Sequence, residues 1–400
     1  MTDKVVLAYS GGLDTSIAIK WLADKYNVDV IAFTVDIGGV ADLESIKQKA
    51  LKVGAIKAIV MDARKAFVNE YLFPAIKANV LYEGQYPLAT ALGRPLMAKL
   101  QVDVARQEGA VAVAHGSTGK GNDQVRFDVS VAALAPDLKI MAPAREWGMT
   151  REESIAYAEK HNIPVPITVS SPYSIDENIY GRSIECGVLE DPWVEPPKDA
   201  FIWTKEIKDT PDEPEYLEVT FDKGIPMVLN GETVDGITLL QRINEQAGKH
   251  GIGRIDHIES RLVGIKSREI YEAPAGLLLI KAHKALEAMT LSRSQLRFKE
   301  IVSAEYADIV YNGLWFTAHR KDLEAYINSS QRFVSGTVRM KLHKGNCMVV
   351  GRKSPFSLYD LSLATYDEGD VFDQSASPGF IHIWGLPAKM QRKLQESSEE

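Results

Sequence analysis

Short apolar runs alternate with helical patterns along the first 165 residues of the chain. Because a half-buried or buried strand is marked by β-branched and small apolar residues bounded by turn signals, we expect five strands. They are Val5–Tyr9, Asp29–Val35, Ala58–Met61, Ala110–Ala114 and Lys139–Ala142. Strands that alternate with helices form parallel sheets, so the pattern predicts a doubly wound α/β domain, with ligands bound beyond the carboxyl ends of the strands.

The helices between these strands have recognisable ends. One is predicted to finish near Gly54, since glycine commonly follows a helix C-terminus. Pro95 is predicted to open another helix that closes before Gly109, because proline is favoured in the first turn. Thr150 and Glu153 have the spacing of a capping box and predict a further helix start.

The pattern changes after the α/β region. Residues 164–215 are rich in Pro, Ser and acidic residues and predict a long irregular connection. Beyond it, an α+β region is expected. Its predicted elements are a strand through Leu217, Val219 and Phe221, a turn at Asn230-Gly231, helices at Thr238–Lys249, Pro274–Leu291 and Ser294–Asn312, and a hairpin of Val338–Leu342 with Cys347–Val350.

The last part of the chain, from Pro387, has the pattern of an amphipathic helix with no neighbour in sequence to cover its apolar face. We expect it to dock on another subunit. The pattern therefore divides the chain into residues 1–165, residues 166–370 and a C-terminal tail of residues 371–400.

The composition narrows the possible partners. The 400 residues carry 46 Lys plus Arg against 54 Asp plus Glu, a net charge of −8, with no basic block. This argues against nucleic-acid or membrane partners and favours small molecules. Two cysteines exclude a disulfide framework, and no apolar run suits a signal peptide or a spanning helix, so we expect a cytoplasmic protein.

The first candidate site is the stretch Ser10–Ser16, where an apolar strand stops at Ser-Gly-Gly and a helix begins. Ser10 is a predicted N-cap, and Gly11 and Gly12 permit positive φ angles, so successive N–H groups can converge on an anion at the positive end of the helix dipole. Asp14 is expected to cap the helix electrostatically or to hold a Mg²⁺ ion on phosphate oxygens. The alternative is an ordinary strand-to-helix turn.

The stretch lacks the Gly-Lys-Ser/Thr of a Walker loop and the G-x-G-x-x-G of a dinucleotide fold. Ser-Gly-Gly-x-Asp-Thr-Ser instead resembles the pyrophosphate loop of the ATP pyrophosphatases, which split ATP between the α and β phosphates.

The second candidate site is the stretch His115–Phe127, which follows another predicted strand. Its glycines allow a ligand to approach the backbone closely, and Arg126 offers a bidentate fork for a carboxylate or phosphate. A mobile glycine-rich surface loop is the alternative. Because both loops follow strands of one sheet, we expect them at the same edge.

Together the two loops resemble those of the argininosuccinate synthase family. Further stretches match the family in the same order along the chain. These stretches are residues 81–86 leading to Arg94-Pro95, residues 174–178, 251–256, 266–268 and 272–276. The resemblance weakens after about residue 370.

The resemblance implies an α/β nucleotide-binding domain, an α+β synthetase domain and a C-terminal helix that helps to hold a homotetramer. It implies that ATP, with Mg²⁺, activates citrulline as a citrullyl-adenylate, which aspartate then attacks. Three residues are expected to be catalytic, Asp14, Asp123 and Arg126. Those expected to hold ATP are Ala8, Tyr9, Ser10, Gly11, Gly12, Leu13, Asp14, Thr15, Ser16, Val35 and Gly116. Those expected to hold aspartate are Thr118, Asn122 and Asp123. Those expected to hold citrulline are Tyr86, Thr90, Ala91, Asn122, Arg126, Ser174, Ser183, Glu259 and Tyr271.

Two positions depart from the family pattern. Ala91 stands where a serine commonly helps to hold citrulline, although Thr90 keeps a hydroxyl nearby, and Val35 replaces the usual alanine, which leaves a backbone contact intact.

The residues by themselves also leave two other functions as alternatives. A tRNA-modifying ATP pyrophosphatase would need a basic face and a cysteine near the nucleotide. A non-catalytic nucleotide sensor would not need Asn122, Asp123 and Arg126 and would bind ATP without releasing pyrophosphate.

Overall fold

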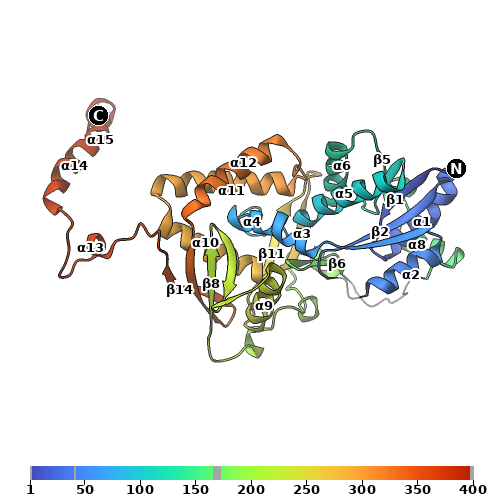
Figure 1. Ribbon diagram of the computed structural model, residues 1–400, viewed down its shortest axis with the longest axis horizontal. Helices are drawn as coiled ribbons and strands as arrows, with labels where there is room; N and C mark the ends of the chain where they lie inside the picture. Colours follow the sequence, from blue (N-terminus) through green and yellow to red (C-terminus); the bar gives the residue numbers. More distant parts are fainter. Residues whose placement is uncertain (1, 40–41, 165–172, 397–400) are drawn as a thin grey trace. The chain divides into compact units, whose positions relative to one another are not determined.

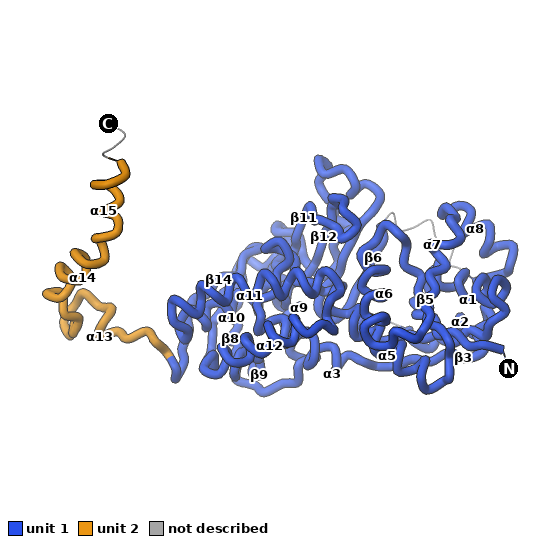
Figure 2. Tube along the Cα trace, turned by 90° about the horizontal axis from the view of Figure 1, so that it is seen from above, with its two compact units in different colours: residues 1–356 blue, residues 357–400 orange. Residues whose placement is uncertain are grey.

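The computed structural model describes residues 2–39, 42–164 and 173–396. The chain divides into two compact units, residues 1–356 and residues 357–400 (Figure 2). Within the described residues, no helix is both long and apolar enough to cross a membrane.

A five-stranded parallel sheet forms the first part of the larger unit (Figure 1). Its strands are β1 (Lys4–Ala8), β2 (Asp29–Asp36), β3 (Lys57–Asp62), β4 (Ala112–Ala114) and β5 (Lys139–Met141), in the order β3-β2-β1-β4-β5. This confirms the doubly wound prediction. The order reverses beside β1, where the chain leaves toward β2 on one side and β4 lies on the other, and such switch points are where open α/β sheets bind ligands.

The two faces of the sheet follow from the alternation of side chains along β1. Val5 and Leu7 pack with α1 (Leu13–Tyr26) and α8 (Arg151–Lys160), whereas Val6 packs with α5 (Ala89–Glu108) on the other face. The predicted capping box at the start of α8 is confirmed. The remaining helices of this part are α2 (Leu43–Val53), α3 (Arg64–Ala66), the π-helical η1 (Phe67–Leu72), α4 (Phe73–Lys77), α6 (Asp123–Leu134) and α7 (Pro143–Trp147).

The prediction that Pro95 opens a helix was wrong. Helix α5 already begins at Ala89 and continues through Pro95. A proline in a helix interior costs about 3 kcal/mol, but Ala89, Ala91 and Leu92 in the first turn are fully buried, and that burial outweighs the cost. The predicted end before Gly109 is confirmed, as is the end of α2 before Gly54.

Two antiparallel sheets and four long helices make up the rest of the larger unit. One sheet has the order β10-β9-β8-β13-β14, with β8 (Glu215–Asp222), β9 (Ile225–Leu229), β10 (Glu232–Thr233), β13 (Gly336–His343) and β14 (Asn346–Lys353). The other has the order β11-β12-β7-β6, with β6 (Ser174–Asn178), β7 (Gly181–Glu185), β11 (Arg254–Ser260) and β12 (Lys266–Glu272). The helices are α9 (Gly236–Lys249), α10 (Pro274–Thr290), α11 (Arg293–Tyr311) and α12 (Ala318–Ser330).

The expected helices and the β13–β14 hairpin are confirmed within a few residues, but the irregular connection predicted for residues 164–215 was wrong in part. It contains the hairpin β6–β7, because β7 pairs with the distant strand β12. Residues 165–172 of the predicted connection lie outside the described residues. The rest contains the short 3₁₀ turns η2 (Gly187–Glu190), η3 (Lys198–Ala200) and η4 (Ile207–Asp209).

The fully buried carboxylate of Glu272 holds this connection to the sheet. It accepts hydrogen bonds from the backbone N–H groups of Ile202, Trp203 and Thr204 at 2.8–3.1 Å, and from the Thr204 hydroxyl at 2.7 Å. Arg182 on β7 forms an ion pair with the same carboxylate at 2.5 Å.

The smaller unit contains α13 (Leu361–Ala364), η6 (Gln374–Ala376), α14 (Ser377–Trp384) and α15 (Leu386–Leu394). Helix α15 confirms the helix predicted from Pro387. None of the described residues of these helices is buried, and Trp384 is 73% exposed. The predicted divisions at residues 165/166 and 370/371 remain predictions.

Candidate active site

A cavity of about 440 Å³ lies at the carboxyl ends of the central strands. Of the residues predicted to hold ATP or citrulline, those that line it are Ala8, Tyr9, Ser10, Gly12, Leu13, Asp14, Thr15, Val35, Gly116 and Ser174. The loops after β1, β2 and β4 thus meet at one place, as the sequence predicted for the two glycine-rich loops.

The loop after β1 differs from the predicted one in its cap. Gly12, not Ser10, is the N-cap of α1, and its φ of −72° is open to any residue, so only Gly11 uses a positive φ. The Ser10 hydroxyl instead accepts a hydrogen bond from the N–H of Gly12 at 3.3 Å. Gly11 and Ser16 do not line the cavity: Ser16 is buried with its hydroxyl 3.1 Å from that of Tyr9.

His115 holds the start of the second loop. Its Nδ1 accepts a hydrogen bond from the N–H of Ser117 at 3.2 Å, and its Nε2 donates to Asp128 at 2.8 Å. Arg145 contacts the same Asp128 carboxylate at 2.8 Å. This chain of contacts fixes the backbone beside Gly116, which lines the cavity.

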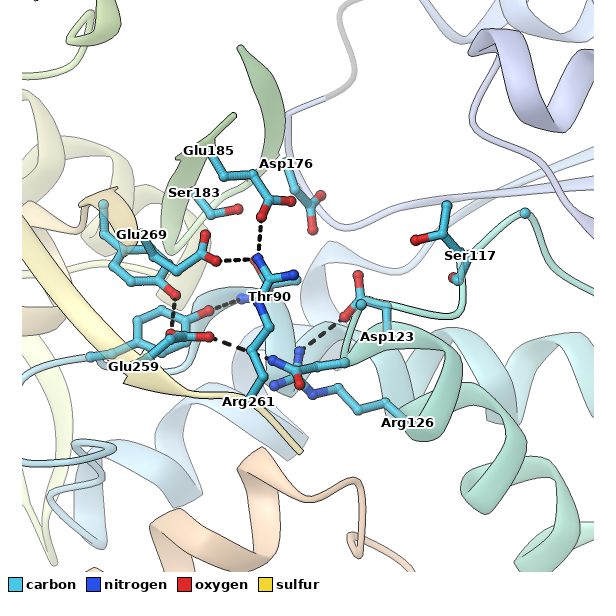
Figure 3. A pocket seen from close by; sticks show the side chains of 16 residues that line it. Thr90, Ser117, Asp123, Arg126, Asp176, Ser183, Glu185, Glu259, Arg261 and Glu269 are labelled. Atoms are coloured by element: carbon cyan, nitrogen blue, oxygen red, sulfur yellow. Dashed lines mark hydrogen bonds and ion pairs between the residues drawn. The ribbon is translucent and has the colours of Figure 1, made fainter. Parts of the chain in front are cut away.

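A second cavity, of about 250 Å³, lies between the starts of α5 and α6 and the sheet that contains β7 and β12 (Figure 3). Nearly all of the residues predicted to hold citrulline or aspartate line it, namely Tyr86, Thr90, Thr118, Asn122, Asp123, Arg126, Ser183, Glu259 and Tyr271. Ala91 is fully buried and lines neither cavity.

The two cavities share part of their walls. Gly116, Ser117, Asp123, Asp176 and Glu185 line both of them. A ligand atom in one cavity can therefore lie close to a ligand atom in the other only along this shared wall, and a reaction between the two ligands would take place there.

Ion pairs surround Asp123 at this wall. Its Oδ2 lies 2.8 Å from Nη2 of Arg94 and its Oδ1 lies 2.9 Å from Nη1 of Arg126, and Arg94 also pairs with Asp176. Burial alone would raise the pKa of Asp123, but the two guanidinium groups outweigh it and lower the pKa. For Asp176, burial and the charge of Asp123 prevail over Arg94 and raise the pKa.

Glu259 marks the opposite end of the second cavity. This nearly buried carboxylate accepts hydrogen bonds from the phenols of Tyr271, at 2.6 Å, and Tyr311, at 2.7 Å. The Tyr271 ring stacks on Tyr86 at 3.9 Å between centroids, and the Tyr311 ring stacks on Tyr82 at 3.6 Å. The carboxylate is therefore held in one orientation by rigid aromatic pairs.

Five residues that line the two cavities or contact their lining were not predicted from the sequence: Arg94, Asp176, Arg261, Glu269 and Tyr311. Arg94 and Asp176 lie in stretches that carried the family resemblance, so a charge count along those stretches could have found them. Nothing local distinguishes Tyr311, which reaches Glu259 from the end of α11.

Comparison with known proteins identifies the relatives of the chain. A family model described as the arginosuccinate synthase N-terminal HUP domain matches residues 4–164, and one described as the arginosuccinate synthase C-terminal domain matches residues 173–391. An argininosuccinate synthase of Dehalococcoides mccartyi is 65% identical over 400 residues, which are 100% of this chain and 98% of that protein. The chain belongs to the argininosuccinate synthase family.

As in the family, its activity is that of an ATP-dependent ligase that makes argininosuccinate in arginine biosynthesis. The argininosuccinate synthase of Brevibacillus brevis is 57% identical over 394 residues, which are 98% of this chain and 94% of that protein. Among solved structures, the U34-tRNA thiolase NcsA from Methanococcus maripaludis aligns with 42% of this chain and 61% of its own, at 17% identity. Its TM-score of 0.26 is too low to support a conclusion.

Proposed function

We propose that the enzyme joins citrulline to aspartate in two steps. The ureido oxygen of citrulline attacks the α-phosphorus of ATP, so that an O–P bond forms, the bond to the bridging oxygen breaks and pyrophosphate leaves. The amine of aspartate then attacks the ureido carbon, the C–O bond breaks and AMP leaves with the oxygen. The first step is needed because a ureido carbon is a poor electrophile.

The wall shared by the two cavities carries this proposal. The first cavity begins at the loop after β1, where backbone N–H groups and the positive end of α1 suit the phosphates of ATP. The second is small and polar, as an amino acid requires. ATP in the first cavity and citrulline in the second would bring the α-phosphorus and the ureido oxygen together beside Asp123, where positioning and charge supply the catalysis.

We assign citrulline to Tyr86, Arg126, Ser183 and Glu259, with the α-ammonium group near Glu259. Thr118, Asn122 and Asp123 would hold aspartate. The low pKa of Asp123 makes it a poor proton acceptor at neutral pH, so its role would be to orient the aspartate amine and to stabilise the charge that develops on attack.

Mg²⁺ fits the first cavity through Asp14. The described residues contain no group of three or more His, Cys, Asp or Glu side chains that could hold a metal alone. A Mg²⁺ ion that is bound mainly by phosphates and water needs one or two carboxylates, and Asp14 lines the cavity. When bound, the ion would neutralise phosphate charge.

Oxygen transfer tests the proposal. With citrulline labelled by ¹⁸O in the ureido group, mass spectrometry should find the label in AMP. Unlabelled AMP, formed while argininosuccinate accumulates, would exclude the citrullyl-adenylate. Omitting aspartate should still give one equivalent of pyrophosphate per active site.

We also propose that the protein is a cytoplasmic homotetramer, held in part by the C-terminal helices. The exposed apolar side chains of α14 support a role of the C-terminal helices in subunit contact, since an apolar surface of this kind is typical of such a contact.

A further inference from the structure

Three carboxylates from the sheet β11-β12-β7-β6 line the second cavity. Glu185 on β7, Glu259 on β11 and Glu269 on β12 all line the cavity, and the guanidinium of Arg261 lies among them (Figure 3). Nη2 of Arg261 forms ion pairs with both Glu185 and Glu269. Three carboxyl groups thus lie near one guanidinium, and Arg126, which also lines the cavity, is paired with Asp123.

Among the residues that the structure describes, Glu269 is buried and has hydrogen-bond donors on only one of its two oxygens, whereas the Glu185 side chain is 35% exposed and can be hydrated. Glu269 is 4% exposed, and its Oε1 receives the Arg261 guanidinium and the hydroxyl of Ser267, the latter at 3.0 Å. Within the described part of the chain, no hydrogen bond reaches its Oε2. By contrast, each oxygen of Glu259 accepts a hydrogen bond from a tyrosine.

The surroundings of Glu269 disfavour its negative charge. Burial, with the charges of Glu185 and Glu259, raises its pKa to about 8 in spite of Arg261. The strand β11 contributes Glu259 and His257, and His257 lies directly across the strand pair from Glu269. The other titratable groups around Glu269 are Glu185, Cys186, Arg261 and Tyr271. His257 is already paired with Glu83 at 3.0 Å. In the absence of substrate, Glu269 therefore keeps its proton to a higher pH than an ordinary carboxyl group does.

An arriving cation would change this balance. A substrate ammonium group placed between Glu259 and Glu269 would compensate the excess of negative charge and favour the ionised form of Glu269. An ammonium group is a three-fold donor, and Oε2 of Glu269 is an acceptor on a side chain that lines the cavity.

We propose that Glu269 is a second carboxylate partner of the α-ammonium group of citrulline, and that binding of this group releases the proton of Glu269 to solvent. The inference rests on the proposed function, which places citrulline in this cavity. Glu269 would bind the amino-acid head and take no part in the transfer of phosphorus.

The affinity for citrulline should therefore depend on pH. Below pH 8 the proton must be removed before the ion pair forms, so the citrulline affinity should rise with pH, by up to tenfold per unit. Above pH 8 Glu269 is already ionised, and the affinity should become constant with respect to this group.

Calorimetry can count the proton. Citrulline is titrated into the full-length enzyme with α,β-methylene-ATP, which blocks release of pyrophosphate, at pH 7 in two buffers of different ionisation enthalpy. We expect nearly one proton released per citrulline at pH 7, and progressively fewer as the pH is raised to 8.5, where the α-ammonium group of free citrulline still keeps its proton. The probe 5-ureidopentanoate, which is citrulline without its α-ammonium group, should release none.

Three variants distinguish citrulline binding by Glu269 from a purely structural role of this residue. Glu269→Gln should abolish proton release and remove the pH dependence of the citrulline affinity between pH 6 and 8. It should also weaken citrulline binding at least about tenfold, the usual cost of losing a hydrogen bond to a charged group. Glu190→Gln is the matched control, because Glu190 is an exposed carboxylate beside the neighbouring cavity. Ser267→Ala keeps the Glu269 carboxylate, so it should still release a proton even if Glu269→Gln folds poorly.

The inference is overturned if the wild-type enzyme releases no proton at pH 7, if 5-ureidopentanoate releases as many protons as citrulline, or if Glu269→Gln releases as many as the wild type. If citrulline does not bind at all, the proposed function fails with it. If citrulline binds and labels AMP without proton release, only the role of Glu269 is refuted.

Discussion

Replacing Asp123 by Asn should separate the two steps of the reaction. The side chain is 28% exposed and contacts Arg94 and Arg126 at 2.8 and 2.9 Å. Alanine would leave the buried Arg126 without a carboxylate, and breaking a buried pair costs about 3–5 kcal/mol, so both steps would suffer. Asparagine keeps the volume and one acceptor oxygen, and Arg94 keeps Asp176.

The expected loss for Asp123→Asn is that of a charged hydrogen-bond partner, about 1.5–3 kcal/mol, which corresponds to roughly 10–150-fold. It should fall on the aspartate-dependent release of AMP. A rapid-quench assay with labelled ATP would follow pyrophosphate without aspartate and AMP with it. The pyrophosphate burst should keep its amplitude in Asp123→Asn and be lost in Arg126→Ala. Asp137→Asn, on the exposed surface, is the control.

Two results would refute this reasoning. If Asp123→Asn loses the burst as completely as Arg126→Ala, Asp123 belongs to the nucleotide or citrulline site. If the wild-type rate of AMP release depends on a group with a pKa near 7 and this dependence disappears in Asp123→Asn, then Asp123 exchanges a proton, and its low pKa in the free enzyme does not describe the working state.

Three further outcomes are expected. Tyr311→Phe removes one of the two phenols that hold Glu259, so steady-state kinetics should show the KM for citrulline raised about tenfold with the KM for ATP unchanged, and an unchanged citrulline KM would contradict that positioning role. Glu287→Gln leaves the buried Lys299 unpaired and should lower the free energy of unfolding by about 3 kcal/mol in urea, whereas an unaltered midpoint would show that the pair contributes little. Trp384→Asp should reduce the mass seen by light scattering while the circular dichroism stays constant, and a constant mass would exclude α14 from the subunit contact.

The sequence was sufficient for features that depend on neighbouring residues. The strand, glycine loop and helix from Val5 to Tyr26 were predicted because apolar periodicity and turn chemistry are local. The meeting of the two glycine-rich loops followed from the geometry of a parallel sheet. The family resemblance then supplied the residues of the second cavity, which no local pattern would have joined.

Features that depend on distant residues were missed. The strand β6 reads Ser-Ile-Asp-Glu-Asn and has no apolar alternation, because it is an edge strand whose partner β7 is secured by β12. Helix α5 passes through Pro95 because its first turn is buried by other parts of the chain. Arg261 meets Glu185, which is 76 residues away in the sequence, because β12 of its hairpin pairs with β7.

The contact between Glu272 and residues 202–204 has a consequence for how this chain can vary. The connection between β7 and β8 has some thirty residues, and Glu272 attaches part of it through three consecutive peptide groups, whose N–H donors do not depend on side-chain identity. Arg268 holds an earlier part of the same connection in the same way, through the backbone carbonyls of Asp191 and Val194. Because these contacts use peptide groups, the side chains at the attached positions can vary while the attachment, and with it the face of β7 that carries Ser183 and Glu185, stays in place. Changes of length are expected to be tolerated between the attached positions rather than at them.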